Sequence, residues 1–184
     1  MSPSPGRRSW TLYPGHARVP DAAAPDVRAR SYAIVATATL TRPEEGGVLL
    51  AHGDRHAGYV LRVADGRLVH EYAQDGRRST VTSADVVPLG RPVRLEVHVR
   101  RTGGAGVVRL VVDGRDSGHG TISALARART GYTGVDVGCD RGLTVGDYAA
   151  PARFTGRLDR VEVHAEDDQW LDLAAVWEIE GATQ

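Results

Sequence analysis

Three side chains that could do acid–base chemistry or bind a metal lie within five residues of one another, in the segment AHGDRH: His52, Asp54 and His56. An imidazole and a carboxylate this close could bind a divalent metal, or the carboxylate could orient a histidine that acts as a general base. Strand alternation places His52 on the face of Val48 and Leu50, whereas Asp54 and His56 are expected in a loop. The spacing leaves a catalytic cluster and a solvated loop as alternatives, and we assign no metal ligand.

A second group of candidates follows from Asp65-Gly66, a dipeptide that accepts the positive φ angles of a tight hairpin. A two-residue turn there pairs Ala64 with Arg67 and fixes which side chains share a face. One face then carries Tyr59, Leu61, Val63, Leu68, His70 and Tyr72, and the other carries Val60, Arg62, Arg67, Val69 and Glu71. This mixed chemistry suggests a sheet that is partly covered on both sides.

His70 shares its face with Tyr59 and Tyr72, whose rings could stack against a sugar or a polycyclic substrate. The imidazole of His70 could then act as an acid or a base on that ligand. The alternative is a core histidine that is hydrogen-bonded to a neighbouring tyrosine. On the other face, Arg62 and Glu71 are placed to form a cross-strand ion pair. The candidate catalytic residues are therefore His70, His52, Asp54 and His56, and the candidate ligand-binding residues are Tyr59, Tyr72, Arg62 and Glu71.

Three further acids, Asp136, Asp140 and Asp147, invite a calcium reading, but they lack the alternate-residue spacing of a calcium loop. Asp140 between glycines is expected to accept backbone hydrogen bonds in a turn, with Tyr148 packing nearby. We therefore predict no metal and no other cofactor.

The elements that must position these residues are short alternating runs separated by Gly, Asp and Pro, from Ser31 onward. This pattern predicts an all-β fold, a two-sheet antiparallel jelly-roll sandwich. Residues 1–30 are expected to form a tail or strap pinned at Trp10, residues 31–165 the sandwich, and residues 166–184 a short helical extension, because Trp170, Leu173 and Trp177 recur at helical spacing.

The composition of the chain limits the classes of partner and the compartment that we expect for it. The 184-residue chain suits one domain, and its 23 basic residues, all Arg, balance 23 acidic ones. Nucleic acid is therefore not an expected partner, and no run of apolar residues is long enough to span a membrane. The single cysteine, Cys139, and the lack of an apolar core after Arg7-Arg8 favour a cytoplasmic protein.

The segment GVLLAHGDRHAGYVLRVADGRLVHEYA, followed by DVGCDRGLTVGDYAAPARFTGRLDRVEVH, resembles the C-terminal jelly-roll domain of the large bacterial arylsulfatases. That domain is similar in fold to concanavalin A-like lectin/glucanase and laminin-G sandwiches. The likeness covers roughly residues 32–164. It implies a concanavalin A-like fold without sulfatase activity, because the Cys/Ser-x-Pro-x-Arg stretch of sulfatases is not matched around Cys139.

Three functions remain open. The first is a domain that binds a small molecule or carbohydrate on its concave sheet. The second is a small enzyme, an isomerase, cyclase or hydrolase, that uses His/Asp acid–base chemistry on that face. The third is an interaction module that forms a homodimer through the Trp170/Trp177 segment. The sequence does not decide whether the protein is an enzyme.

Overall fold

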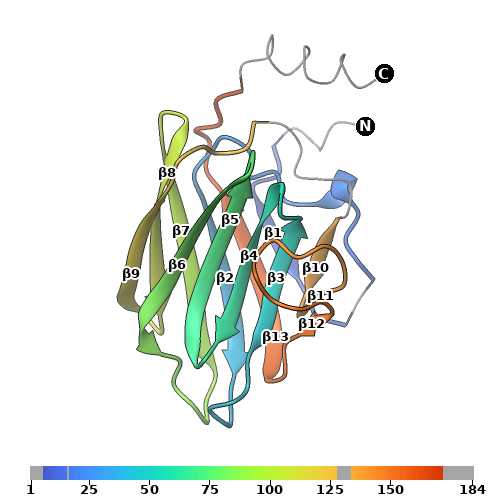
Figure 1. The fold of residues 1–184 in the computed structure, drawn as a ribbon, viewed down its shortest axis with the longest axis vertical. Coiled ribbons are helices and arrows are strands. Elements are labelled where there is room, and N and C mark those ends of the chain that lie inside the picture. Colours follow the sequence, from blue (N-terminus) through green and yellow to red (C-terminus); the bar gives the residue numbers. More distant parts are fainter. Residues whose placement is uncertain (1–5, 16, 128–133, 172–184) are drawn as a thin grey trace.

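The computed structural model describes residues 6–15, 17–127 and 134–171, and apart from one short 3-10 helix the regular secondary structure in these ranges consists of strands (Figure 1). In chain order the elements are β1 (Ser9–Leu12), the 3-10 helix η1 (Asp21–Ala23), β2 (Tyr32–Thr39), β3 (Gly47–Gly53), β4 (Ala57–Ala64), β5 (Arg67–Gln74), β6 (Arg77–Val86), β7 (Val93–Thr102), β8 (Ala105–Val112), β9 (Arg115–Ile122), β10 (Val135–Val137), β11 (Cys139–Asp140), β12 (Ala152–Arg153) and β13 (Arg157–Ala165).

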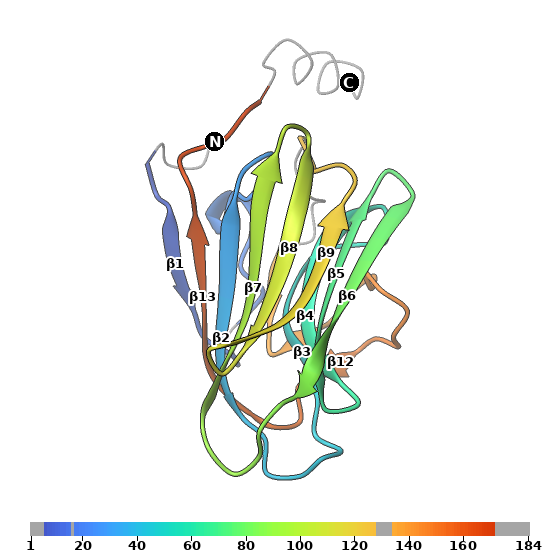
Figure 2. The ribbon, with the colours of Figure 1, turned by 90° about the vertical axis from the view of Figure 1, so that its left-hand side faces the viewer.

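Two large sheets face each other across an apolar core. In the described residues, one sheet has the strand order β1-β13-β2-β7-β8-β9 and the other has the order β10-β3-β4-β5-β6. Figure 2 shows them as two separate layers. The predicted two-sheet antiparallel sandwich is confirmed, and its first strand, β1, pairs with its last, β13.

The turns explain why neighbouring strands pair as they do. Asp65 and Gly66 have φ angles of 50° and 69°, as a type I′ turn between β4 and β5 requires. Asp113 and Gly114, at 52° and 80°, join β8 to β9 in the same way. The predicted pairing of Ala64 with Arg67 is also observed.

The alternation predicted for β4 and β5 sorts their side chains between two layers of packing. The inward-facing residues, which include Tyr59, Leu61 and Leu68, join the main core between the sheets. The outward-facing residues do not all meet solvent, because Val60 and Ala73 pack in a second, smaller apolar cluster. The five-stranded sheet is therefore covered on both faces.

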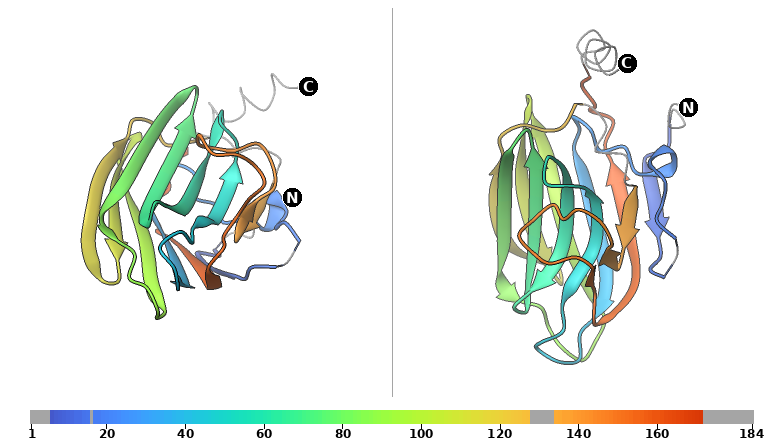
Figure 3. Two further views of the ribbon diagram at one scale, coloured as in Figure 1. Left: turned by 60° about the horizontal axis from the view of Figure 1, so that its bottom comes forward. Right: turned by 45° about the vertical axis from the view of Figure 1, so that its right-hand side comes forward.

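The cover on the outer face is the segment between β11 and β12. Figure 1 and the right-hand view of Figure 3 show this loop crossing in front of the sheet. Val145 of the loop is fully buried against Val48, Ala51 and Val60. A loop that is distant in sequence thus shapes the face on which β4 and β5 present their polar residues.

Trp10 is 5% exposed and lies in β1, opposite Val163 of β13, so its side chain anchors the N-terminal segment to the six-stranded sheet. The division of the chain at residues 30 and 165 stays a prediction. Residues 166–171 are described and form no helix. Two of their backbone N–H groups bond to the segment before β2 instead: Glu166 donates to the Ser31 carbonyl at 2.8 Å and Trp170 to the Ala29 carbonyl at 3.0 Å. The remainder of the predicted helix, residues 172–184, lies outside the described residues. No helix in the described ranges is long and apolar enough to cross a membrane.

Gly47 is a position where the fold requires glycine. Its φ is +111°, and an added Cβ would lie 2.1 Å from the Arg153 carbonyl oxygen. Gly66 also has a positive φ, +69°, but its Cβ would meet open space.

We expect Gly66→Ala to cost about 1 kcal/mol of unfolding free energy through backbone strain alone. Gly47→Ala should cost at least about 3 kcal/mol, because the backbone must also move. Urea unfolding of both variants measures this, and equal losses would contradict the steric argument.

Candidate functional site

The cluster of His52, Asp54 and His56 does not converge on one point. The register of β3 shifts between Val48 and Leu50, so Val48 faces outward while Leu50 and His52 face the interior. The Asp54 carboxylate accepts hydrogen bonds from the backbone N–H groups of His56, at 2.7 Å, and Ala57, at 3.2 Å, which closes the β3–β4 turn. His56 itself is exposed.

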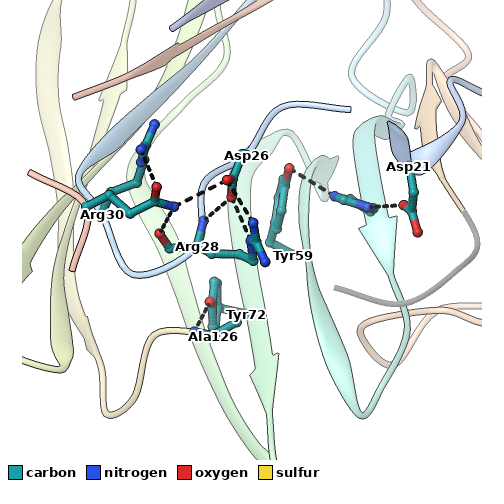
Figure 4. Close-up of polar contacts among 9 residues, drawn as sticks. Asp21, Asp26, Arg28, Arg30, Tyr59, Tyr72 and Ala126 are labelled. Carbon is teal, nitrogen blue, oxygen red and sulfur yellow. Dashed lines mark hydrogen bonds and ion pairs between the residues drawn. The ribbon is translucent and has the colours of Figure 1, made fainter. Parts of the chain in front are cut away.

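His52 has structural partners instead. Its Nδ1 lies 3.3 Å from the Tyr59 hydroxyl and its Nε2 lies 2.9 Å from Asp21 Oδ1 (Figure 4). Asp21 belongs to η1, so this contact ties the segment before β2 to the five-stranded sheet. In the described ranges, no group of three or more His, Cys, Asp or Glu side chains is placed to hold a metal ion.

Tyr59, His70 and Tyr72 share one face as predicted, but that face is the interior of the sandwich. Their exposed fractions are 1%, 0% and 4%. The Tyr72 hydroxyl accepts a hydrogen bond from the Ala126 N–H at 2.8 Å (Figure 4), and burial raises the pKa of Tyr72 to about 12. The binding and catalytic roles assigned to these residues stay predictions, and their burial points to packing.

The His70 ring is a polar group that is buried completely inside the sandwich. Within the part of the chain that the structure describes, neither ring nitrogen has a hydrogen-bond partner, and the Tyr72 ring lies 6.5 Å away between centroids. Burial lowers the pKa of His70 to about 4, because the charged imidazolium would lose its hydration.

The segment that crosses this end of the sandwich is held by its own polar network (Figure 4). Asp26 forms an ion pair with Arg28 at 2.8 Å, and Gln169 donates to Asp26 at 3.3 Å while accepting from Arg30 at 2.7 Å. These contacts join the segment before β2 to the chain that leaves β13. Tyr59 lies near this network in Figure 4 and is 1% exposed.

Of the predicted ligand-binding residues, Arg62 and Glu71 lie on the outer face of the five-stranded sheet, where the Arg62 side chain is 18% exposed. Arg62 of β4 donates from Nε to Glu71 Oε2 of β5 at 2.8 Å, which is the predicted cross-strand pair. The Arg62 guanidinium lies over the Tyr148 ring, with Cζ 5.2 Å from the ring centroid. Arg78 of β6 forms an ion pair with Asp147. We call these five residues, Arg62, Glu71, Arg78, Asp147 and Tyr148, the outer-face site.

The loop between β11 and β12 positions two members of this site. The Tyr148 hydroxyl donates to Asp140 Oδ2 at 2.7 Å, and Asp140 Oδ1 accepts the Gly142 N–H at 3.0 Å, as expected for an acid that fixes a turn. Burial and the nearby carboxylate of Asp140 raise the pKa of Tyr148. Asp136 binds Arg18 and Arg141 instead, so the three acids considered for calcium have separate protein partners.

The sequence pointed to Arg62 and Glu71 but not to Arg78 as a site residue. Arg78 and Asp147 are 69 positions apart in the chain, and only the path of the loop brings them together. The glycines around Asp140 and the single tyrosine that follows were the available signal for a folded loop. They did not reveal which strand the loop would cross.

Comparison with known proteins identifies the architecture. The chain matches no protein-family model and no curated protein. Among solved structures, the CBM40 of the Ruminococcus gnavus IT-sialidase, bound to α2,3-sialyllactose, is similar with a TM-score of 0.61 and 16% identity over 94% of this chain and 96% of that one. The fold is a concanavalin A-like jelly roll.

Two longer proteins contain the same fold. Mouse laminin α1 domains LG4–5 give a TM-score of 0.56 with 17% identity over 91% of this chain, and the NanB sialidase of Streptococcus pneumoniae, as its K499G mutant, gives 0.59 with 14% identity over 96%. This chain spans 44% and 28% of their respective lengths. At these identities the likeness shows the fold alone, and the arylsulfatase resemblance stays a prediction.

The buried His70 predicts a pH dependence of stability. Its folded pKa lies below the ordinary 6.5, so between 6.5 and about 4 the unfolded chain binds a proton that the folded chain does not, and stability falls as the pH falls through that window. Between about pH 7 and about pH 4.5, wild type should lose about 2 kcal/mol more unfolding free energy than His70→Leu.

Urea unfolding at the two pH values measures this difference. Val163→Ala, which truncates a fully buried apolar side chain of β13 on the other sheet and adds or removes no titratable group, is the matched control and should retain the wild-type pH dependence. A His70→Leu variant as acid-sensitive as wild type would contradict the assignment.

Proposed function

We propose that this protein is a carbohydrate-binding domain whose ligand binds at the outer-face site. The observation that carries the proposal is the likeness to a sialidase carbohydrate-binding module, solved with sialyllactose, over nearly the whole of both chains. Because a shared fold does not fix function, the proposal also requires chemistry suited to a sugar on an accessible surface.

Arg62 supplies that chemistry. Its side chain is 18% exposed, and within the described residues its two terminal guanidinium nitrogens, Nη1 and Nη2, form no hydrogen bond. Glu71 holds Nε from one side while the Tyr148 ring packs over the guanidinium. A donor group whose geometry is already fixed loses little conformational entropy when a ligand hydroxyl or carboxylate binds.

The neighbouring surface supplies more hydrogen-bonding groups. Thr80 and Thr82 of β6 are exposed and lie opposite Glu71 and Val69 of β5, on the same outer face. Hydroxyl groups both donate and accept, which matches the hydroxyls of a sugar. The ligand would therefore lie along β5 and β6, beside the edge of the loop that carries Tyr148.

The enzyme alternative has less support. It depends on acid–base work by His52 or His70, and both rings are buried, His70 completely. The outer-face site holds its carboxylates in pairs with arginines, an arrangement that suits binding. We therefore propose saturable binding without turnover.

Titration of the protein with lactose and with 3′-sialyllactose, followed by amide chemical shifts, tests the proposal. Arg62→Lys keeps a cation beside Glu71 but removes the forked donors, so it should weaken binding by about tenfold or more. Arg109→Lys, an exposed arginine on the outer face of the six-stranded sheet, is the matched control and should bind as wild type does.

Shifts that map to residues of β4, β5 and β6 would support the proposed position, and thermal unfolding would verify that both variants are folded. A wild-type protein that binds neither sugar, or an Arg62→Lys variant that binds as well as wild type, would overturn the proposal.

A further inference from the structure

The loop between β11 and β12 lies across the outer face and makes side-chain contacts with the sheet there. Four consecutive residues each meet a different part of the sheet. Val145 enters the apolar cluster, Gly146 lies against the Glu71 carboxylate, Asp147 pairs with Arg78, and Tyr148 covers Arg62. Three neighbouring strands, β4, β5 and β6, supply the polar partners.

The contacts of this loop differ in how firmly they are held. Val145 is fully buried and Gly146 packs so closely that a Cβ there would lie 2.2 Å from Glu71 Oε2. Asp147, in contrast, has a side chain that is 86% exposed, and its partner Arg78 is 38% exposed. An ion pair this open to water is weakly held, so a competing anion could displace it without unfolding the loop.

The arginine side chains around Asp147 favour the charged form of its carboxylate. The hydrogen bond from Arg78, together with the positive charges of Arg78 and Arg55, lowers the pKa of Asp147. The carboxylate is therefore ionised at neutral pH. It is paired with Arg78, the cation that an acidic group on a ligand at the outer-face site would otherwise bind.

We propose that Asp147 determines the charge preference of the outer-face site, by neutralising Arg78 and repelling acidic sugars that would bind beside Arg62. This inference rests on the function proposed above. Neutral sugars do not compete with Asp147, whereas an acidic sugar must displace its carboxylate from Arg78 and approach a like charge. Asp147 is thus a specificity-determining residue in the loop, separate from the donors that hold the sugar.

Asp147→Asn tests this inference in the full chain, with 3′-sialyllactose and lactose as the acidic and neutral probes. The ratio of sialyllactose affinity to lactose affinity should rise by about fivefold or more, because one repulsive charge is removed and Arg78 is released. The gain should shrink in about 0.5 M NaCl, where exposed charges are screened. Asp147→Glu, which keeps the charge, should leave the ratio near that of wild type.

The matched control is Asp159→Asn, which removes the acid of another Arg–Asp pair, 2.7 Å from Arg157, on the six-stranded sheet. It changes the net charge equally and should leave the ratio unchanged. A loosened loop would alter both affinities together, so the ratio separates that effect from a charge effect.

The outcomes distinguish this inference from the proposed function. Binding of both probes with an unchanged ratio in Asp147→Asn would overturn the role of Asp147 and leave sugar binding intact. Failure of wild type and all variants to bind either probe would overturn both. A raised ratio in Asp159→Asn as well would show a general charge effect and would also overturn the role of Asp147.

Discussion

A carboxylate that is almost completely shielded from water needs a cation beside it, and the outer face of the five-stranded sheet is organised around that requirement. Glu71 is 4% exposed, and Arg62 on the next strand supplies the cation at 2.8 Å. Removing the Arg62 charge would leave the buried Glu71 carboxylate without a cation, which is far more costly than never having the pair. The strands, the hairpin turn and the covering loop all keep these two groups together.

Much of this arrangement follows from local sequence. The Asp65-Gly66 turn fixes the register of β4 and β5, and the two-residue period of strands then places Arg62 and Glu71 on one face. The same rule placed His70 correctly among its neighbours. It could not say which face was the interior, because both faces of this sheet carry apolar residues and both are covered.

The remaining differences arise from features that local patterns do not encode. The bulge in β3 places Val48 and His52 on opposite faces of the sheet, and nothing in GVLLAHG marks an extra residue in the register. The partners of His52 and Arg78 come from segments 31 and 69 positions away. A tight turn limits its neighbours to a few choices, whereas a long loop does not, so Asp147 could be recognised as an acid but not as the partner of Arg78.

The pairing of the first strand with the last also has a mechanical consequence. Ser9, at the start of β1, lies opposite His164, near the end of β13, and the two strands run antiparallel. A pulling force applied at Ser9 and His164 would therefore load the backbone hydrogen bonds one after another, as in opening a zipper, and not all at once. Under such a force β1, an edge strand of its sheet, would separate first, and the outer face of the five-stranded sheet would keep its shape.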